Sequence, residues 1–175
     1  HKEFKDSEFG QIPENWEINE LNDCLEIMTD FVANGSFQSL RENVNVKDKV
    51  DYALYVRLFD IRKGIIHQSQ KYVDKNSYNF LKKSSLHGDE ILIANIGAYV
   101  GQVHLMPKIN EPATLAPNMI LLRVLKKYHY KFLYYFLSSD LGQKIIFLSV
   151  AGSGQEKLNK TDLKKIKIVL PTMDE

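Results

Sequence analysis

Basic side chains interleaved with aromatic rings are the feature of this sequence best suited to binding chemistry, and they gather between residues 55 and 83. Seven basic residues stand there against two acidic ones, Asp60 and Asp74, with five aromatic residues among them. This pattern is typical of protein surfaces that contact nucleic-acid phosphates, although a solvated strand-and-helix face is the alternative. The predicted phosphate contacts are Arg62, Lys63, Lys71, Lys75, Lys82 and Lys83. We expect these positive charges to converge on one face of the folded chain.

Two glycine-containing segments add a second set of candidate contacts. Gly97 and Gly101 lie between apolar stretches, where they favour a tight turn or a close approach of the backbone to a phosphate. Residues 152–155, Gly-Ser-Gly-Gln, end a helical region and allow the same two interpretations. Amide and basic side chains near these turns suit base edges or backbone contacts. The predicted groove or loop contacts are Asn76, Asn95, Tyr99, Gln102, Gln155 and Lys157.

Catalytic and metal-binding motifs are missing from the sequence. It contains no GxxxxGK[ST] loop, no GxGxxG, no HExxH and no GxSxG. The five histidines are scattered without the spacing of metal ligands. Asp89 and Glu90 are adjacent, so in a strand they point to opposite faces and cannot form an acid–base pair. We therefore predict no catalytic residue and no metal site.

The charge balance is uneven along the 175 residues. Residues 1–51 hold 5 basic and 12 acidic side chains, a net of −7, whereas residues 52–175 hold 18 and 10, a net of +8. The sum is the +1 of the whole chain, which argues against a binder held only by bulk positive charge. The single Cys24 excludes an internal disulfide and a cysteine-rich zinc site, which fits a cytoplasmic protein. No secretory signal or membrane-spanning run is visible.

The elements that must position these residues give an α+β pattern. Residues 1–9 are expected to be a flexible entry segment, and the polar residues 29–51 either a long loop or a variable insertion. Strands are predicted over residues 52–61 and 65–73 and in three runs between 87 and 125, with a short helix near 76–86. Apolar residues spaced by three and four over 128–149, interrupted by Ser138-Ser139-Asp140, predict a helical hairpin. Asn159 is expected to cap a short helix, and residues 166–171 to form a last strand.

Several strings occur together in an order that resembles one family. They are GQIPENWEINEL, YVRLFDIRKGII, GDEILIANIGAYVGQVHLM, APNMILLRV, FLYYFLSSDLGQKII and GSGQEKLNKTDLKKIKIVLP. Each is weak alone, but the ordered set resembles the target recognition domain of type I restriction-modification specificity subunits, from about Gly10 to Glu175.

That resemblance implies a DNA-reading domain with a twisted β-helix-like sheet followed by an α-helical hairpin. It also implies double-stranded DNA as ligand, with methylation subunits and a restriction subunit as partners. Those partners use S-adenosylmethionine and ATP, so no cofactor is expected on this chain. The sequence stops where the family's spacer helix would begin. Residues 1–175 are therefore expected to be a single target recognition domain that reads one half of a bipartite site.

Two other functions remain open at the level of sequence. One is an enzyme, for example the recognition end of a fused methyltransferase-nuclease whose catalytic part has been cut away, which a flanking methyltransferase motif in the full gene would reveal. The helical hairpin is also compatible with a protein-interaction domain, which would bind its partner equally well without DNA.

Overall fold

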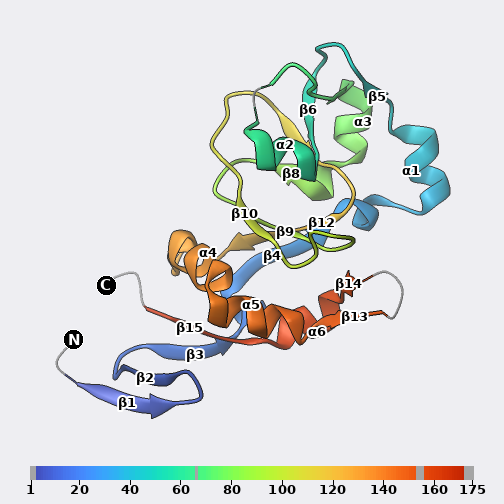
Figure 1. Cartoon of the computed structure of the whole chain (residues 1–175). Helices are drawn as coiled ribbons and strands as arrows, with labels where there is room; N and C mark the ends of the chain where they lie inside the picture. The colour runs from blue at the N-terminus through green and yellow to red at the C-terminus, as the bar shows by residue number, and fades with distance from the viewer. Residues whose placement is uncertain (1–2, 66, 153–155, 172–175) are drawn as a thin grey trace.

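Two neighbouring sheets form the framework of the computed structural model, which describes residues 3–65, 67–152 and 156–171 (Figure 1). The first is a mixed sheet with the strand order β5-β7-β6-β11-β8. Its central pair, β6 and β11, is parallel, and its other neighbours are antiparallel. The strands are β5 (Val46–Lys47), β6 (Ala53–Val56), β7 (Tyr72–Val73), β8 (Ser85–Leu86) and β11 (Ala113–Leu115).

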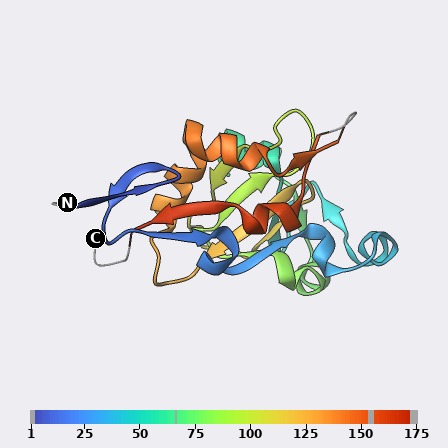
Figure 2. The ribbon, with the colours of Figure 1, turned by 90° about the horizontal axis from the view of Figure 1, so that it is seen from below.

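Helices cover both faces of this mixed sheet, so every residue of β6 is buried (Figure 2). Side chains alternate between the faces of a strand. On one face, Leu54 belongs to the same apolar cluster as Ile61 of α2. On the other face, Tyr55 belongs to a cluster with Leu40 of α1 and Tyr78 of α3. The helices are α1 (Phe37–Asn43), α2 (Leu58–Lys63) and α3 (Lys75–Phe80).

The second sheet is antiparallel, with the order β10-β9-β12-β4, and it separates two apolar cores. Ile93 of β9 faces the helices α4, α5 and α6, whereas its neighbour Leu92 faces the cluster under α2. The strands are β4 (Leu25–Asp30), β9 (Ile91–Ala94), β10 (Val103–Leu105) and β12 (Met119–Val124). The helices are α4 (Tyr130–Ser138), α5 (Asp140–Phe147) and α6 (Lys160–Lys165).

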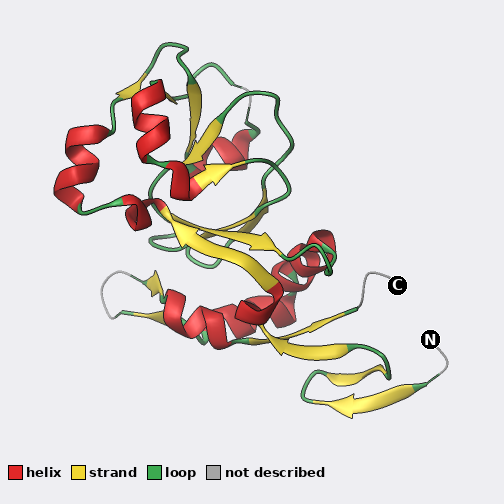
Figure 3. Ribbon diagram, turned by 180° about the vertical axis from the view of Figure 1, so that it is seen from behind, coloured by secondary structure: helices red, strands yellow, loops and turns green. Residues whose placement is uncertain are grey.

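Three two-stranded ribbons and three short 3-10 turns complete the described part of the chain (Figure 3). The ribbon of β3 and β15 brings the first and last fifths of the sequence together. The ribbons are β1 (Phe4–Ser7) with β2 (Gly10–Pro13), β3 (Glu17–Glu20) with β15 (Lys167–Leu170), and β13 (Val150–Ala151) with β14 (Lys157–Leu158). The turns are η1 (Leu21–Cys24), η2 (Phe31–Asn34) and η3 (Lys82–Ser84). Within the described residues, no helix combines the length and the apolar character needed to cross a membrane.

Several predicted elements are confirmed. The helical hairpin forms as α4 and α5, and the Ser139 hydroxyl caps α5 by accepting a hydrogen bond from the Gly142 N–H at 3.1 Å. Asn159 caps α6 by accepting from the Thr161 N–H at 2.8 Å. The short helix near 76–86 forms as α3, and the last strand as β15. The mixed α/β architecture of sheets and helices agrees with the predicted α+β class.

Other predicted elements are wrong. Residues 4–13 form the β1–β2 hairpin, for which no strands were predicted, and residues 29–51 hold η2, α1 and β5 rather than a long loop. The strand expected over 52–61 ends at Val56, because the Asp60 carboxylate accepts the Arg57 backbone N–H and starts α2 there. The strand expected over 65–73 is reduced to β7. The strands lie in separate sheets, so the twisted β-helix-like sheet is not confirmed.

Candidate nucleic-acid interface

Exposed aromatic rings and cations meet on one side of α2, and we call Phe59, Arg62, Lys63 and Tyr99 the α2 surface. The Arg62 guanidinium carbon lies 3.7 Å from the centroid of the Tyr99 ring, and Lys63 Nζ lies 4.7 Å from that of Phe59. Phe59 and Tyr99 are 43% and 40% exposed. Among the described residues, neither Arg62 nor Lys63 forms an ion pair with an acid. The α2 surface therefore offers positive charge and open ring faces together.

Tyr99 sits on the loop that joins β9 to β10. Gly97 and Gly101 take positive φ angles of 83° and 84°, which allow this tight turn and confirm the turn predicted there. The Gly101 N–H donates to the Ala94 carbonyl at 2.8 Å, and the Gln143 amide of α5 donates to the Gly101 carbonyl at 3.1 Å. The loop is thus fastened to the helical hairpin, which fixes the base from which Tyr99 projects.

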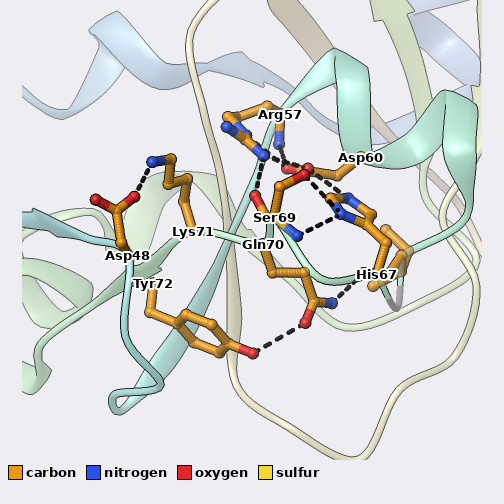
Figure 4. A network of polar contacts seen from close by, with 9 residues as sticks. Asp48, Arg57, Asp60, His67, Ser69, Gln70, Lys71 and Tyr72 are labelled. Atoms are coloured by element: carbon orange, nitrogen blue, oxygen red, sulfur yellow. Dashed lines mark hydrogen bonds and ion pairs between the residues drawn. The ribbon is translucent and has the colours of Figure 1, made fainter.

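A polar network anchors the start of α2 to the segment that follows it (Figure 4). The buried Asp60 carboxylate accepts hydrogen bonds from Arg57 at 2.7–2.9 Å and contacts His67 Nε2 at 2.8 Å. Burial alone would raise the pKa of Asp60, but the hydrogen bonds from Arg57 hold the pKa below its usual value. The Ser69 N–H donates to His67 Nδ1 at 3.2 Å. Nδ1 is then an acceptor, so Nε2 carries the proton that Asp60 accepts.

The hydrogen bonds of this network leave Asp60, His67 and Ser69 in a structural role. Asp60, His67 and Ser69 make contacts that resemble those of a hydrolytic triad. However, the Ser69 backbone N–H already occupies His67 Nδ1, and the Asp60 carboxylate is shared with Arg57. Arg57 also donates to the Ser69 carbonyl at 2.6 Å, so the three residues brace the loop on which they lie. The network is a scaffold for the α2 surface.

His104 of β10 lies close to Arg62 beneath the α2 surface. Burial lowers the pKa of His104 below its usual value, and the nearby Arg62 charge lowers it further. Its Nε2 atom is buried and has no hydrogen-bond partner among the described residues. The lowered pKa favours the neutral imidazole, and Arg62 is the exposed cation here.

A separate open groove of about 1260 Å³ lies on the other side of the mixed sheet, between η2 and α1 above and β14 and α6 below. Two predicted contacts, Asn95 and Lys157, line it. They are neighbours because the Leu158 N–H donates to the Asn95 carbonyl at 2.9 Å. The Lys160–Asp30 ion pair, at 2.6 Å, joins the two walls.

The structure does not gather the predicted contacts on one face. Arg62 and Lys63 lie on α2, whereas Lys75, Lys82 and Lys83 belong to α3 and η3 on the opposite side of the mixed sheet. The expected convergence of charge is therefore wrong. Its physical cause is the alternation of side chains along β6, which places α2 and α3 against different faces.

The remaining predicted residues have mixed surroundings. Lys71 is paired with Asp48, and Lys83 Nζ donates to the Ala33 carbonyl at 3.1 Å. Lys75 Nζ lies 5.7 Å from the centroid of the Tyr52 ring. Asn76, Lys82 and Gln102 are exposed. Gln155 lies outside the described residues.

Some residues of this region were missed in the sequence. Phe59 was one of the interleaved aromatic residues, but its segment was predicted as a strand, so its pairing with Lys63 four residues on, which needs a helix, was missed. His104 carried no local signal, since its proximity to Arg62 depends on how β10 packs beneath α2. In the part of the chain that the structure describes, no cluster of His, Cys, Asp and Glu could hold a metal ion.

A family profile and several curated proteins match this chain. The profile of the type I restriction modification DNA specificity domain matches residues 13–175. Two proteins of Methanocaldococcus jannaschii, named as the MjaX and MjaVIII type I restriction enzyme specificity subunits, are 31% and 28% identical over 98% and 100% of this chain. The chain spans about two fifths of their length, 39% and 40% respectively.

Solved structures share the fold at low sequence identity. The HsdS subunit from Thermoanaerobacter tengcongensis has a TM-score of 0.58 at 16% identity, over 98% of this chain and 37% of its own length. A type I S subunit from M. genitalium has a TM-score of 0.52 at 17% identity, over 90% of this chain and 34% of its own. The profile match over residues 13–175 shows that the chain belongs to the type I restriction-modification DNA specificity domain family.

Proposed function

We propose that the chain is a target recognition domain that reads one half of a bipartite double-stranded DNA site for a type I restriction-modification complex. The observation that carries this proposal is the family match over residues 13–175. The chain accounts for about two fifths of its relatives' length, which suits one recognition unit of a subunit that holds two. We take residues 1–175 as that single unit.

The α2 surface is the part of the molecule that we assign to the duplex. Its cations have no acidic partner among the described residues, so phosphates or base edges are free to take that place. Its Tyr99 lies on the β9–β10 loop, as does the exposed Gln102, and Gln143 of the helical hairpin holds this loop through the Gly101 carbonyl. The other sequence-derived contacts stay predictions: Lys71, Lys75, Asn76, Lys82, Lys83, Asn95, Gln155 and Lys157.

The chemistry of restriction and modification belongs, in this proposal, to other subunits. Methylation subunits would transfer the methyl group, and a restriction subunit would cleave, so this chain binds no cofactor and works in the cytoplasm. Exposed apolar side chains on the helical hairpin support contact with such partners. Tyr135 is 68% exposed and Leu148 is 83% exposed.

Selection from a randomised pool of DNA duplexes tests the proposal. The purified 175-residue chain is mixed with the pool at low salt, and the bound fraction is separated by gel shift and sequenced. We expect enrichment of a motif of a few base pairs, because one unit reads half of a bipartite site. Retention of the pool without any enriched motif, or no retention at low salt, would contradict the proposal and favour a protein-interaction domain.

A further inference from the structure

Arg62 differs from the other three arginines in what its guanidinium is free to do. The Arg57 guanidinium donates hydrogen bonds to Asp60 and to the Ser69 carbonyl, and that of Arg123 donates to Glu90 and to the Ser85 carbonyl. Arg41 is exposed on α1, and no aromatic ring of the described residues lies against its guanidinium. Arg62 alone is both exposed and stacked on a ring, as far as the described residues show.

Stacking leaves the donors of Arg62 open. A guanidinium carries its five N–H donors in its own plane, so a ring beneath that plane does not compete for them. The guanidinium carbon lies 3.7 Å from the centroid of the Tyr99 ring, so the ring supports one face of the group while Arg62 stays exposed to solvent. Restriction before binding lowers the entropy that is lost when a planar ligand is engaged.

The supports of this pair are themselves rigid. Tyr99 is held through the contact of Gln143 with Gly101, and Arg62 is held on a helix that the Arg57–Asp60 contacts start. Burial and the Arg62 charge both lower the pKa of the half-buried His104, which disfavours a second positive charge beside Arg62. These contacts therefore hold the Arg62 guanidinium at one place on the α2 surface.

A fixed pair of parallel donors suits one base in particular. Guanine offers two acceptors side by side in the major groove, O6 and N7, and bidentate arginine is the common partner for them. Phosphate contacts need no such orientation, since a flexible lysine serves as well. Lys63, next to Arg62 in sequence, is well placed for that simpler role.

We infer that Arg62 is a specificity-determining residue that reads a guanine in the half-site, and that Tyr99 is the positioning residue that holds its guanidinium. This inference rests on the proposed function, and it changes the role predicted for Arg62 from a phosphate contact to a base contact.

The test applies pool selection and salt titration to variants of the whole chain. For Arg62→Ala we expect the wild-type motif to lose its guanine at one position, by about 10- to 100-fold in discrimination, with the other positions kept. The slope of log affinity against log salt should stay unchanged, because the variant keeps every phosphate contact. Tyr99→Leu should weaken the same position, whereas Tyr99→Phe, which keeps the ring, should retain it. Arg41→Ala is the matched control, since it removes an exposed helical arginine from the other side of the sheet.

The outcomes separate this inference from the function beneath it. A wild-type chain that selects no motif overturns the proposed function and the inference together. A wild-type motif that Arg62→Ala leaves intact, with a salt slope lower by about one, returns Arg62 to a phosphate contact and overturns the inference alone. Loss of a base other than guanine also overturns it. Equal effects of Tyr99→Leu and Tyr99→Phe would remove the positioning role.

Discussion

Cys24 shows how strongly one residue's chemistry depends on its place in the fold. It is fully buried at the end of η1, in the core beneath α4 and α6. Burial raises the pKa of its thiol from 9.0 to about 11, and Asp23 adds to the shift. At neutral pH it is an apolar filler of the core rather than a nucleophile.

This pKa has a consequence for stability at alkaline pH. A group with a raised pKa stabilises the folded state fully below its unfolded pKa, and that contribution is lost as the pH rises toward the folded one. Between pH 9 and 11 we expect the free energy of unfolding to fall by about 1.4 kcal/mol per pH unit more than in a Cys24→Ala variant. Urea unfolding at several pH values measures the free energy of unfolding of the original protein and of the Cys24→Ala variant. Parallel pH profiles of the two proteins would refute the assignment.

At the scale of the secondary-structure elements, Gly142 determines how closely α4 and α5 pack against each other. A Cβ at this position would lie 2.0 Å from the Phe136 carbonyl oxygen and 2.7 Å from the Leu137 Cα. Both are backbone atoms of α4, which cannot move aside as a side chain can. The close packing of α4 against α5 therefore requires a residue without a side chain at position 142.

Replacing Gly142 with alanine should reverse the usual effect of that exchange. Within a free helix, alanine is more favourable than glycine by about 1 kcal/mol. Here we expect Gly142→Ala to lower the free energy of unfolding by about 2–3 kcal/mol, because α4 and α5 must separate. Chemical denaturation measures the change. The exposed Lys144→Ala on the same helix serves as control and should stay within about 0.5 kcal/mol; a stabilised Gly142→Ala variant would disprove the clash.

Elements with strong local signals were predictable from sequence, and those shaped by distant contacts were not. The helical hairpin and α6 follow from apolar spacing and from the caps Ser139 and Asn159. The helix α1 is short and buries a single residue, Leu40, against Phe31 and Tyr55, so its sequence resembles a loop. The same holds for the site. Residue types between 55 and 83 indicated an anion-binding function, but the packing of α2 and α3 against opposite faces of β6 decides which side each cation takes.

At the scale of the whole molecule, the mixed sheet divides the positive charge into two groups. Lys63 lies on the side of α2, whereas Lys82 and Lys83 lie on the side of α3. A straight duplex resting on one of these faces cannot touch the other. The groups therefore make different contributions to DNA binding, although all three residues were predicted phosphate contacts.

Salt titration distinguishes the two faces. The slope of log affinity against log salt is negative, and each phosphate that a variant no longer neutralises reduces its magnitude by about 0.9. We expect Lys63→Ala to lower it by this amount. The double change Lys82→Ala with Lys83→Ala should lower it by less than the value of about 1.8 that two direct contacts give. A larger effect of the double change would move the interface to the α3 face.

The ribbon of β3 and β15 carries a consequence for how the chain folds. Its partners, such as Lys167 and Glu20, are roughly 150 positions apart in sequence, so their pairing closes almost the entire chain into a loop. The entropy of that closure must be lost before the pairing contributes any stability, and contacts of such long range make folding slow. The ribbon should form last, once the two sheets have shortened the path between its strands. Until then the Ile168 side chain, fully buried in the native fold, stays open to other chains, and the unfinished domain is at its most prone to aggregate.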